Sequence, residues 1–146
     1  MGQKLDRVIL IVEDSPIDYE ITTRALRRAG FDQNVLHCES GDEAMAFLEG
    51  GSDIFQEKGY PGIILLDLNM PGTDGRDVLN QIKNRAQTKM IPVIILTTSN
   101  NEHDIEECYM KGANSYIQKP TAPDDYTEMA GALKKFWFDW SYLPEV

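Results

Sequence analysis

The sequence has 146 residues, the length of a single domain, and 42% of them are apolar and 26% charged, as in an ordinary globular protein. The net charge of −10 argues against a protein that binds nucleic acid or docks on an anionic membrane surface, because both need a basic face. We find no apolar run long enough to span a membrane, no signal peptide and only two cysteines, so we expect a cytoplasmic protein with reduced thiols.

Apolar runs recur along the chain and predict β-strands. Continuous runs rich in β-branched residues at 8–12, 63–66 and 92–96 are typical of strands that are buried on both faces. Shorter patterns predict two more strands at 35–38 and 115–118. Strands of this kind belong in a parallel sheet that carries helices on both sides.

Between the strands, the apolar residues follow the period of a helix. The expected helices cover residues 17–29, 40–48, 74–85, 102–111 and 123–142. We expect residues 51–60 to form a loop that is longer than the fold needs. Five βα units in series predict an α/β fold, a doubly wound sheet of five parallel strands. It would form one domain over residues 1–146, with no output domain.

Polar side chains stand where the predicted strands end. Glu13 and Asp14 follow the first strand and Asp67 the third, while Thr97 ends the fourth and Lys119 the fifth. The carboxyl ends of parallel strands share one crevice, so these groups should meet there. Clustered carboxylates repel one another and attract a hard divalent cation, Mg²⁺ in most cells. A lysine and a hydroxyl beside such a cation suit a phosphoryl group.

Several stretches of the sequence resemble the receiver domains of two-component response regulators. The resemblance covers the chain from about residue 6 to the last helix, and it implies a flavodoxin-like (βα)5 fold with strand order 2-1-3-4-5. The stretches that carry it are Val12-Glu13-Asp14-Ser15, Leu66-Asp67-Leu68-Asn69-Met70-Pro71-Gly72-Thr73-Asp74-Gly75, Pro92-Val93-Ile94-Ile95-Leu96-Thr97, Gly112-Ala113-Asn114 and Tyr116-Ile117-Gln118-Lys119-Pro120.

The resemblance implies a role for each residue of the crevice. Asp67 would be the phosphoacceptor, which takes a phosphoryl group from a phosphohistidine of a sensor histidine kinase. Mg²⁺ would be held by Glu13, Asp14, Asp67 and the backbone carbonyl of Asn69.

The resemblance also implies groups that bind the phosphoryl group and signal its presence. Lys119 and the Thr97 hydroxyl would contact the phosphoryl oxygens, and a backbone N–H near Thr98 would complete the cradle. Tyr116 would be an aromatic switch that swings inward with Thr97. The Lys119–Pro120 peptide bond would be cis, which would aim Lys119 into the crevice.

The last predicted helix carries more aromatic residues than one core face can hold. We expect Met129, Leu133, Phe136 and Trp140 to form its buried stripe. Phe138 lies about 200° around the helix from Phe136, so the two cannot face the same core. We therefore expect the aromatic end to form an interface, which would contain Phe136, Trp137, Phe138, Trp140 and Tyr142.

This aromatic end narrows the resemblance to the small response regulators that pair with phytochrome kinases. The resemblance then implies a phytochrome as the kinase and a homodimer formed through the last helix. Two other signalling roles stay open, a phosphorelay intermediate and a phosphate sink for a non-phytochrome kinase.

Two remote alternatives are of other classes. A phosphohydrolase of the haloacid-dehalogenase type needs Asp-x-Asp, whereas this chain has Asp67-Leu68-Asn69. A flavodoxin-like electron carrier needs a phosphate-binding loop after the first strand, where this chain has Glu13 and Asp14. We therefore expect no enzyme, only a phosphoacceptor with slow self-dephosphorylation.

Overall fold

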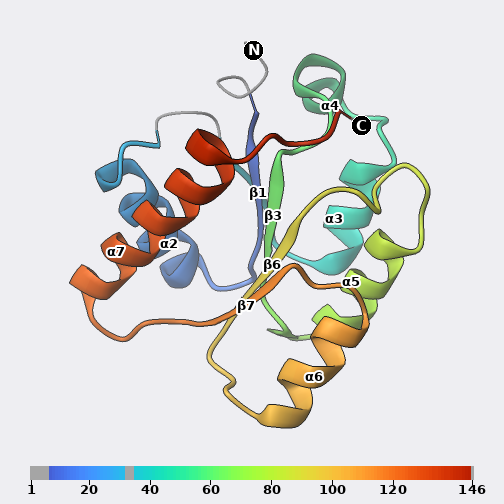
Figure 1. The fold of residues 1–146 in the computed structure, drawn as a ribbon. Coiled ribbons are helices and arrows are strands. Elements are labelled where there is room, and N and C mark those ends of the chain that lie inside the picture. The colour runs from blue at the N-terminus through green and yellow to red at the C-terminus, as the bar shows by residue number, and fades with distance from the viewer. Residues whose placement is uncertain (1–6, 32–34, 146) are drawn as a thin grey trace.

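The computed structural model describes residues 7–31 and 35–145, which form a five-stranded parallel sheet with a helical layer on each side (Figure 1). The strand order is β2-β1-β3-β6-β7, which confirms the predicted topology. The strands are β1 (Ile9–Val12), β2 (Val35–Cys38), β3 (Ile63–Leu66), β6 (Val93–Thr97) and β7 (Ser115–Gln118).

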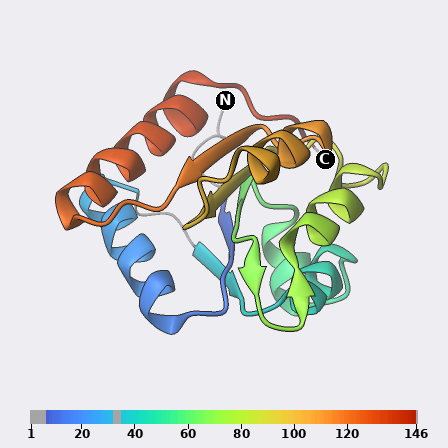
Figure 2. The same cartoon turned by 90° about the horizontal axis from the view of Figure 1, so that it is seen from below.

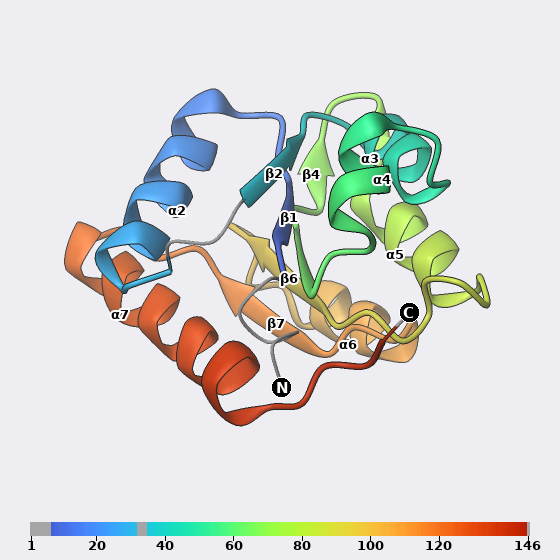
Figure 3. The same ribbon diagram turned by 90° about the horizontal axis from the view of Figure 1, so that it is seen from above.

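Alternation of side chains along the central strands divides the core into two halves. Ile9 and Ile11 of β1 pack against α2 and α7, whereas Leu10 and Val12 pack on the other face against α3, α5 and α6. Figures 2 and 3 show these two layers from opposite ends of the sheet. The helices are α2 (Pro16–Arg28), α3 (Gly41–Leu48), α5 (Gly75–Lys83), α6 (Glu102–Met110) and α7 (Pro123–Lys134). None of the described helices is long and apolar enough to cross a membrane.

Residues 51–60 are not the plain loop that the sequence predicts, because they contain a short helix, α4 (Asp53–Lys58). The Ser52 hydroxyl accepts the Phe55 backbone N–H at 3.0 Å and so caps this helix. The Phe55 ring packs edge-on against Phe47 and Tyr60. This helix has only six residues, and none of them is buried. It therefore lacks the apolar periodicity by which longer helices are recognised in a sequence.

The predicted turn after β3 is a small hairpin of β4 (Asn69–Met70) and β5 (Thr73–Asp74). It connects β3 directly to α5, and Asp74 caps α5 by accepting the Arg76 backbone N–H at 2.9 Å.

The last helix ends in a π-helical turn, η1 (Lys135–Trp140), and this corrects the predicted core stripe. A π turn closes its hydrogen bonds over five residues instead of four, so the side chains after it are rotated. Leu133 and Phe138, five residues apart, are both buried, and the Phe138 ring lies 5.0 Å from that of Phe31. Phe136 is 58% exposed and Trp140 72% exposed, so both are outside the core. The prediction that Phe138 belongs to an exposed interface is wrong.

Candidate functional site

The predicted site residues gather at the carboxyl ends of the strands, which form the lower edge of the sheet in Figure 1. Glu13 and Asp14 follow β1, Asp67 follows β3, Thr97 ends β6 and Lys119 follows β7. All of them except Asp14 are buried. Parallel pairing of four strands therefore brings residues more than 100 positions apart into hydrogen-bond contact.

The Lys119 ammonium group lies at the centre of the site and is 5% exposed. Its Nζ donates to Glu13 Oε1 at 2.7 Å, to Asp18 Oδ2 at 2.8 Å and to Asp67 Oδ2 at 3.4 Å. Burial alone would lower the pKa of Lys119, but the hydrogen bonds to Asp18 and Glu13 and the nearby Asp67 raise it above its ordinary value. Lys119 therefore stays charged and compensates part of the negative charge of the cluster.

Three carboxylates face one another closely enough to share a metal ion. One oxygen from each of Glu13, Asp14 and Asp67 lies within 4.8 Å of the others. Burial raises the pKa of Glu13 to about 7, although its hydrogen bond from Lys119 acts in the opposite direction. Because Lys119 alone does not compensate this buried carboxylate, the site favours additional positive charge. Oxygen ligands of this kind fit a hard divalent cation.

Asp67 is held in place by the backbone on both of its sides. Its backbone N–H donates to the Val12 carbonyl oxygen at 3.1 Å, and its Oδ1 accepts the Asn69 backbone N–H at 3.3 Å. The Asn69 side chain extends across the site and donates from Nδ2 to the Thr97 hydroxyl at 3.3 Å. The Asn69 side chain thus contacts Thr97 directly, which the sequence reading did not expect.

Of two predictions at the end of β7, the structure contradicts one, and the switch role of Tyr116 stays a prediction. The Lys119–Pro120 peptide bond is trans, so the predicted cis bond is wrong. The Lys119 backbone N–H donates to the Thr97 carbonyl oxygen at 2.7 Å, which continues the parallel ladder and aims the side chain at the carboxylates with an ordinary trans bond. Tyr116 is half-buried, and its hydroxyl donates to the Ser99 carbonyl oxygen at 3.0 Å. Thr98 is exposed beside Thr97, and its role in phosphoryl binding stays a prediction.

Asp18 is a site residue that the sequence analysis missed. It lies in the first turn of α2, where its backbone N–H donates to the Ser15 hydroxyl at 3.2 Å. An acidic residue in the first turn of a helix is typical of a capping motif. The sequence therefore offers no reason to assign Asp18 a role in the site. Only the three-dimensional structure, in which the start of α2 comes close to Lys119, shows that the Asp18 carboxylate contacts that ammonium group.

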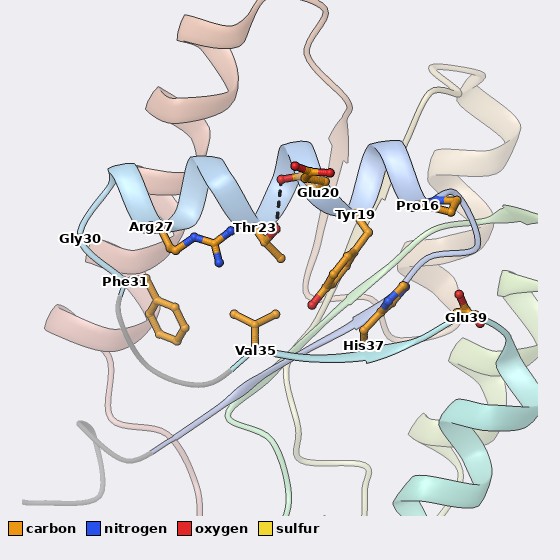
Figure 4. A pocket seen from close by; sticks show the side chains of 10 residues that line it. All are labelled: Pro16, Tyr19, Glu20, Thr23, Arg27, Gly30, Phe31, Val35, His37 and Glu39. Atoms are coloured by element: carbon orange, nitrogen blue, oxygen red, sulfur yellow. Dashed lines mark hydrogen bonds between the residues drawn. The ribbon is translucent and has the colours of Figure 1, made fainter.

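A separate hollow of about 930 Å³ lies on the flank of the molecule between α2 and the edge strand β2 (Figure 4). Tyr19 and His37 stack there face to face, with 3.7 Å between their ring centroids. His37 Nε2 donates to the Glu13 carbonyl oxygen at 2.7 Å, so His37 supports the end of β1 from outside the carboxylate cluster. Neither side chain is among the groups that surround Lys119.

The predicted interface residues lie at the far end of α7 from this site (Figure 1). Phe136, Trp140 and Tyr142 are exposed, while Trp137 is half-buried. Trp137 stacks edge-on against Phe136 with 4.9 Å between the ring centroids.

Comparison with known proteins agrees with this geometry. The family described as response regulator receiver domain matches residues 9–131. The response regulator Rcp1 of Synechocystis sp. is 38% identical over 138 residues, which cover 94% of this chain and 93% of that protein. The Mn²⁺-bound crystal structure of Rcp1 superposes with a TM-score of 0.84 at 37% identity, over 95% of this chain and 99% of the other.

A second solved structure extends the comparison to a phosphorylated protein. The phosphorylated cyanobacterial phytochrome response regulator RcpA superposes with a TM-score of 0.86 at 35% identity, again over 95% of this chain and 99% of the other. The matched family, the strand order and the acidic cluster at the carboxyl ends of the strands agree with one another. The chain belongs to the response regulator receiver domains, and it is similar along nearly its whole length to response regulators of phytochromes.

Proposed function

We propose that Asp67 accepts a phosphoryl group from a phosphohistidine of a sensor histidine kinase. The observation that carries the proposal is the convergence of Asp67, the buried Lys119 ammonium and the acidic pair Glu13 and Asp14 at one point. A receiver that uses this site acts as a switch, because it carries the phosphoryl group instead of turning over a substrate.

The transfer is a substitution at phosphorus. A carboxylate oxygen of Asp67 forms the new O–P bond while the P–N bond to the histidine breaks, and the imidazole nitrogen keeps the electron pair. Lys119 would contribute a fixed positive charge beside the equatorial oxygens, and the Thr97 hydroxyl would turn toward them. Mg²⁺, held by Glu13, Asp14, Asp67 and the Asn69 carbonyl, would neutralise the charge that accumulates there.

The signal would leave the site through Thr97 and Tyr116. In the present arrangement Thr97 is bonded to Asn69, and Tyr116 to the Ser99 carbonyl. Movement of Thr97 to a phosphoryl oxygen breaks the first bond and shifts the loop that carries Ser99. The Tyr116 hydroxyl then loses its present partner, which gives the two arrangements that a switch requires.

We further propose a phytochrome as the kinase, since the similar protein RcpA is a cyanobacterial phytochrome response regulator. A groove of about 480 Å³ between α2 and α7 offers a docking place beside the site. Ile17, which is 71% exposed, and Ile21 form its apolar rim on α2. A kinase makes its phosphohistidine from ATP, and this supports the further proposal that the protein is cytoplasmic.

We propose that a homodimer forms through an exposed aromatic face at the end of the chain, which consists of Phe136 and Trp140 of η1 and Tyr142 just after it. These side chains are large and exposed, and aromatic residues are enriched in protein interfaces. Phe138 has no part in this interface, because it is in the core.

The test of the phosphoacceptor is the mass of the intact protein after incubation with Mg²⁺ and acetyl phosphate. Wild type should gain one labile phosphoryl group, about 80 Da, and Asp67→Asn should gain none. A gain in both proteins would assign the acceptor to another residue. No gain in folded wild type, with either acetyl phosphate or a purified phytochrome kinase, would refute the proposal.

A further inference from the structure

A fourth carboxylate, Asp18, belongs to the site although it does not follow a strand. Lys119 Nζ lies 2.8 Å from Asp18 Oδ2 but 3.4 Å from Asp67 Oδ2. The ammonium group is therefore closer to Asp18 than to the proposed phosphoacceptor. The first turn of α2 holds Asp18 there through its backbone hydrogen bond to Ser15.

We propose that Asp18 is a positioning residue that holds Lys119 away from Asp67 and thereby slows the acceptance of a phosphoryl group. The inference rests on the proposed function of Asp67. An ammonium group has three N–H donors, and here Glu13, Asp18 and Asp67 accept from it. A phosphoryl oxygen that arrives at Asp67 has to replace one of these acceptors, and Asp18 is a strong competitor because it is charged and closely bonded.

The charge of Asp18 acts in the same direction as its hydrogen bond. Counted as ionised, the four carboxylates Glu13, Asp14, Asp18 and Asp67 exceed the single ammonium by three charges, and a divalent cation leaves one of these uncompensated. A phosphodonor is itself an anion, so the remaining charge opposes its approach. Asparagine at position 18 would remove this charge and would at the same time weaken the hydrogen bond to Lys119, because a neutral amide oxygen accepts more weakly than a carboxylate.

Asp18→Asn is a suitable variant because it retains the helix start. The capping bond to Ser15 uses the backbone N–H of residue 18, and asparagine keeps that donor and nearly the same volume. A matched control is Glu20→Gln, which removes one negative charge from the exposed side of the same helix, where Glu20 pairs with Arg24 at 2.7 Å. Both variants thus change the net charge of the protein equally.

The experiment measures the rate at which the intact protein gains a phosphoryl group from acetyl phosphate at saturating Mg²⁺. Saturation removes the effect that a weaker cation affinity would have on the rate. We expect Asp18→Asn to accept the group about two- to fivefold faster than wild type, the range expected when one partly exposed ion pair is lost. Asp18→Glu should restore a slow rate, and Glu20→Gln should react as wild type does.

A second measurement follows the position of the ammonium without any phosphorylation. The Lys119 ammonium resonance in a ¹H–¹⁵N spectrum of the Mg²⁺-bound protein, assigned by its loss in Lys119→Arg, should shift in Asp18→Asn and stay unchanged in Glu20→Gln. An unchanged resonance or an unchanged rate in Asp18→Asn would overturn the proposal. Equal acceleration by Asp18→Asn and Glu20→Gln would also overturn it, because net charge alone would explain the effect.

The two proposals fail in different ways. If folded wild type gains no phosphoryl group from any donor, the function of Asp67 is refuted. If wild type is phosphorylated on Asp67 but Asp18→Asn reacts at the same rate, only the role of Asp18 is refuted.

Discussion

Gly75 lies so close to the backbone of Asp67 that a Cβ at position 75 would stand 2.5 Å from the Asp67 carbonyl oxygen and 2.6 Å from the Leu68 α-carbon. Both of these neighbours are backbone atoms, which cannot turn aside as the end of a side chain can. Because Gly75 is the first residue of α5, the first turn of that helix rests directly on the loop that carries the proposed phosphoacceptor.

Replacement of Gly75 by alanine should therefore displace Asp67. We expect Gly75→Ala to lower the free energy of unfolding by about 1–3 kcal/mol, as overpacking does, and to slow phosphoryl acceptance. Urea unfolding and intact-protein mass measure the two effects. The control is Gly51→Ala, since a Cβ at position 51 would have no neighbour within 4 Å. Equal urea midpoints for both variants would contradict this prediction.

The π-helical turn predicts which aromatic residue of the last helix stabilises the fold. Phe138→Ala should cost about 3–5 kcal/mol of unfolding free energy, because it empties a buried site against Phe31. Phe136→Ala, at an exposed position of the same turn, should change this free energy by about 0.5 kcal/mol or less. Urea unfolding of both variants measures the two losses. A larger loss for Phe136→Ala than for Phe138→Ala would support the regular helical stripe that the sequence predicts.

The exposed aromatic face predicts self-association that depends on Trp140. Wild type should sediment as a dimer, whereas Trp140→Asp should sediment as a monomer of unchanged unfolding free energy, since Trp140 is 72% exposed. Sedimentation velocity over a range of concentrations measures this. A wild type that stays monomeric at every concentration would remove the dimer from the proposed function.

The raised pKa of Glu13 predicts that the stability of the metal-free protein depends on pH. Its pKa is about 7 in the folded protein and near 4.5 when unfolded, so the folded state binds the proton more tightly. The stabilisation is fully present below pH 4.5 and is lost as the pH rises through about 7, with a total change of up to about 3 kcal/mol.

Urea midpoints in a chelator, measured from pH 5 to pH 8, should therefore fall with rising pH in wild type. Glu13→Gln should flatten this dependence, and Mg²⁺ should restore wild-type stability at the upper end of the range. Midpoints that rise with pH in metal-free wild type would show that Glu13 is ionised throughout.

The apolar rim of the groove between α2 and α7 predicts that a substitution there slows phosphoryl transfer from the kinase but not from small phosphodonors. Ile17→Asp should slow transfer from a phytochrome histidine kinase by about tenfold, the loss of one apolar anchor, and should leave transfer from acetyl phosphate near the wild-type rate. Phosphotransfer assays with both donors measure the contrast. An equal loss with both donors would mean that the substitution disturbs the site itself.

The strand order and most of the site could be predicted because both follow from one rule. Buried apolar runs mark parallel strands, and the carboxyl ends of such strands meet, so Glu13, Asp67 and Lys119 could be brought together from sequence alone. The position of Asp18 could not be predicted, because it depends on how close the start of α2 comes to Lys119. The helix over 53–58 lacks an apolar stripe that would have revealed it, and the isomer of the bond before Pro120 was expected only from the family resemblance.

The end of the chain was the weakest part of the prediction, for a specific reason. A regular helix places Phe136 and Trp140 on the stripe that contains Leu133, and the π turn at 135–140 replaces them by Phe138. Nothing in the spacing of the apolar residues distinguishes the two arrangements, since Leu133 has apolar residues both three and five positions later.

One continuous helical element, α7 followed by η1, begins shortly after Lys119. It carries the exposed Phe136 and Trp140 at its other end, about 25 Å along its axis. The proposed phosphorylation site and the proposed dimer interface therefore lie near opposite ends of one helical element, which packs along α2. The proposed kinase groove adjoins the start of this element and the proposed dimer interface lies at its end, so the two partners would use separate surfaces.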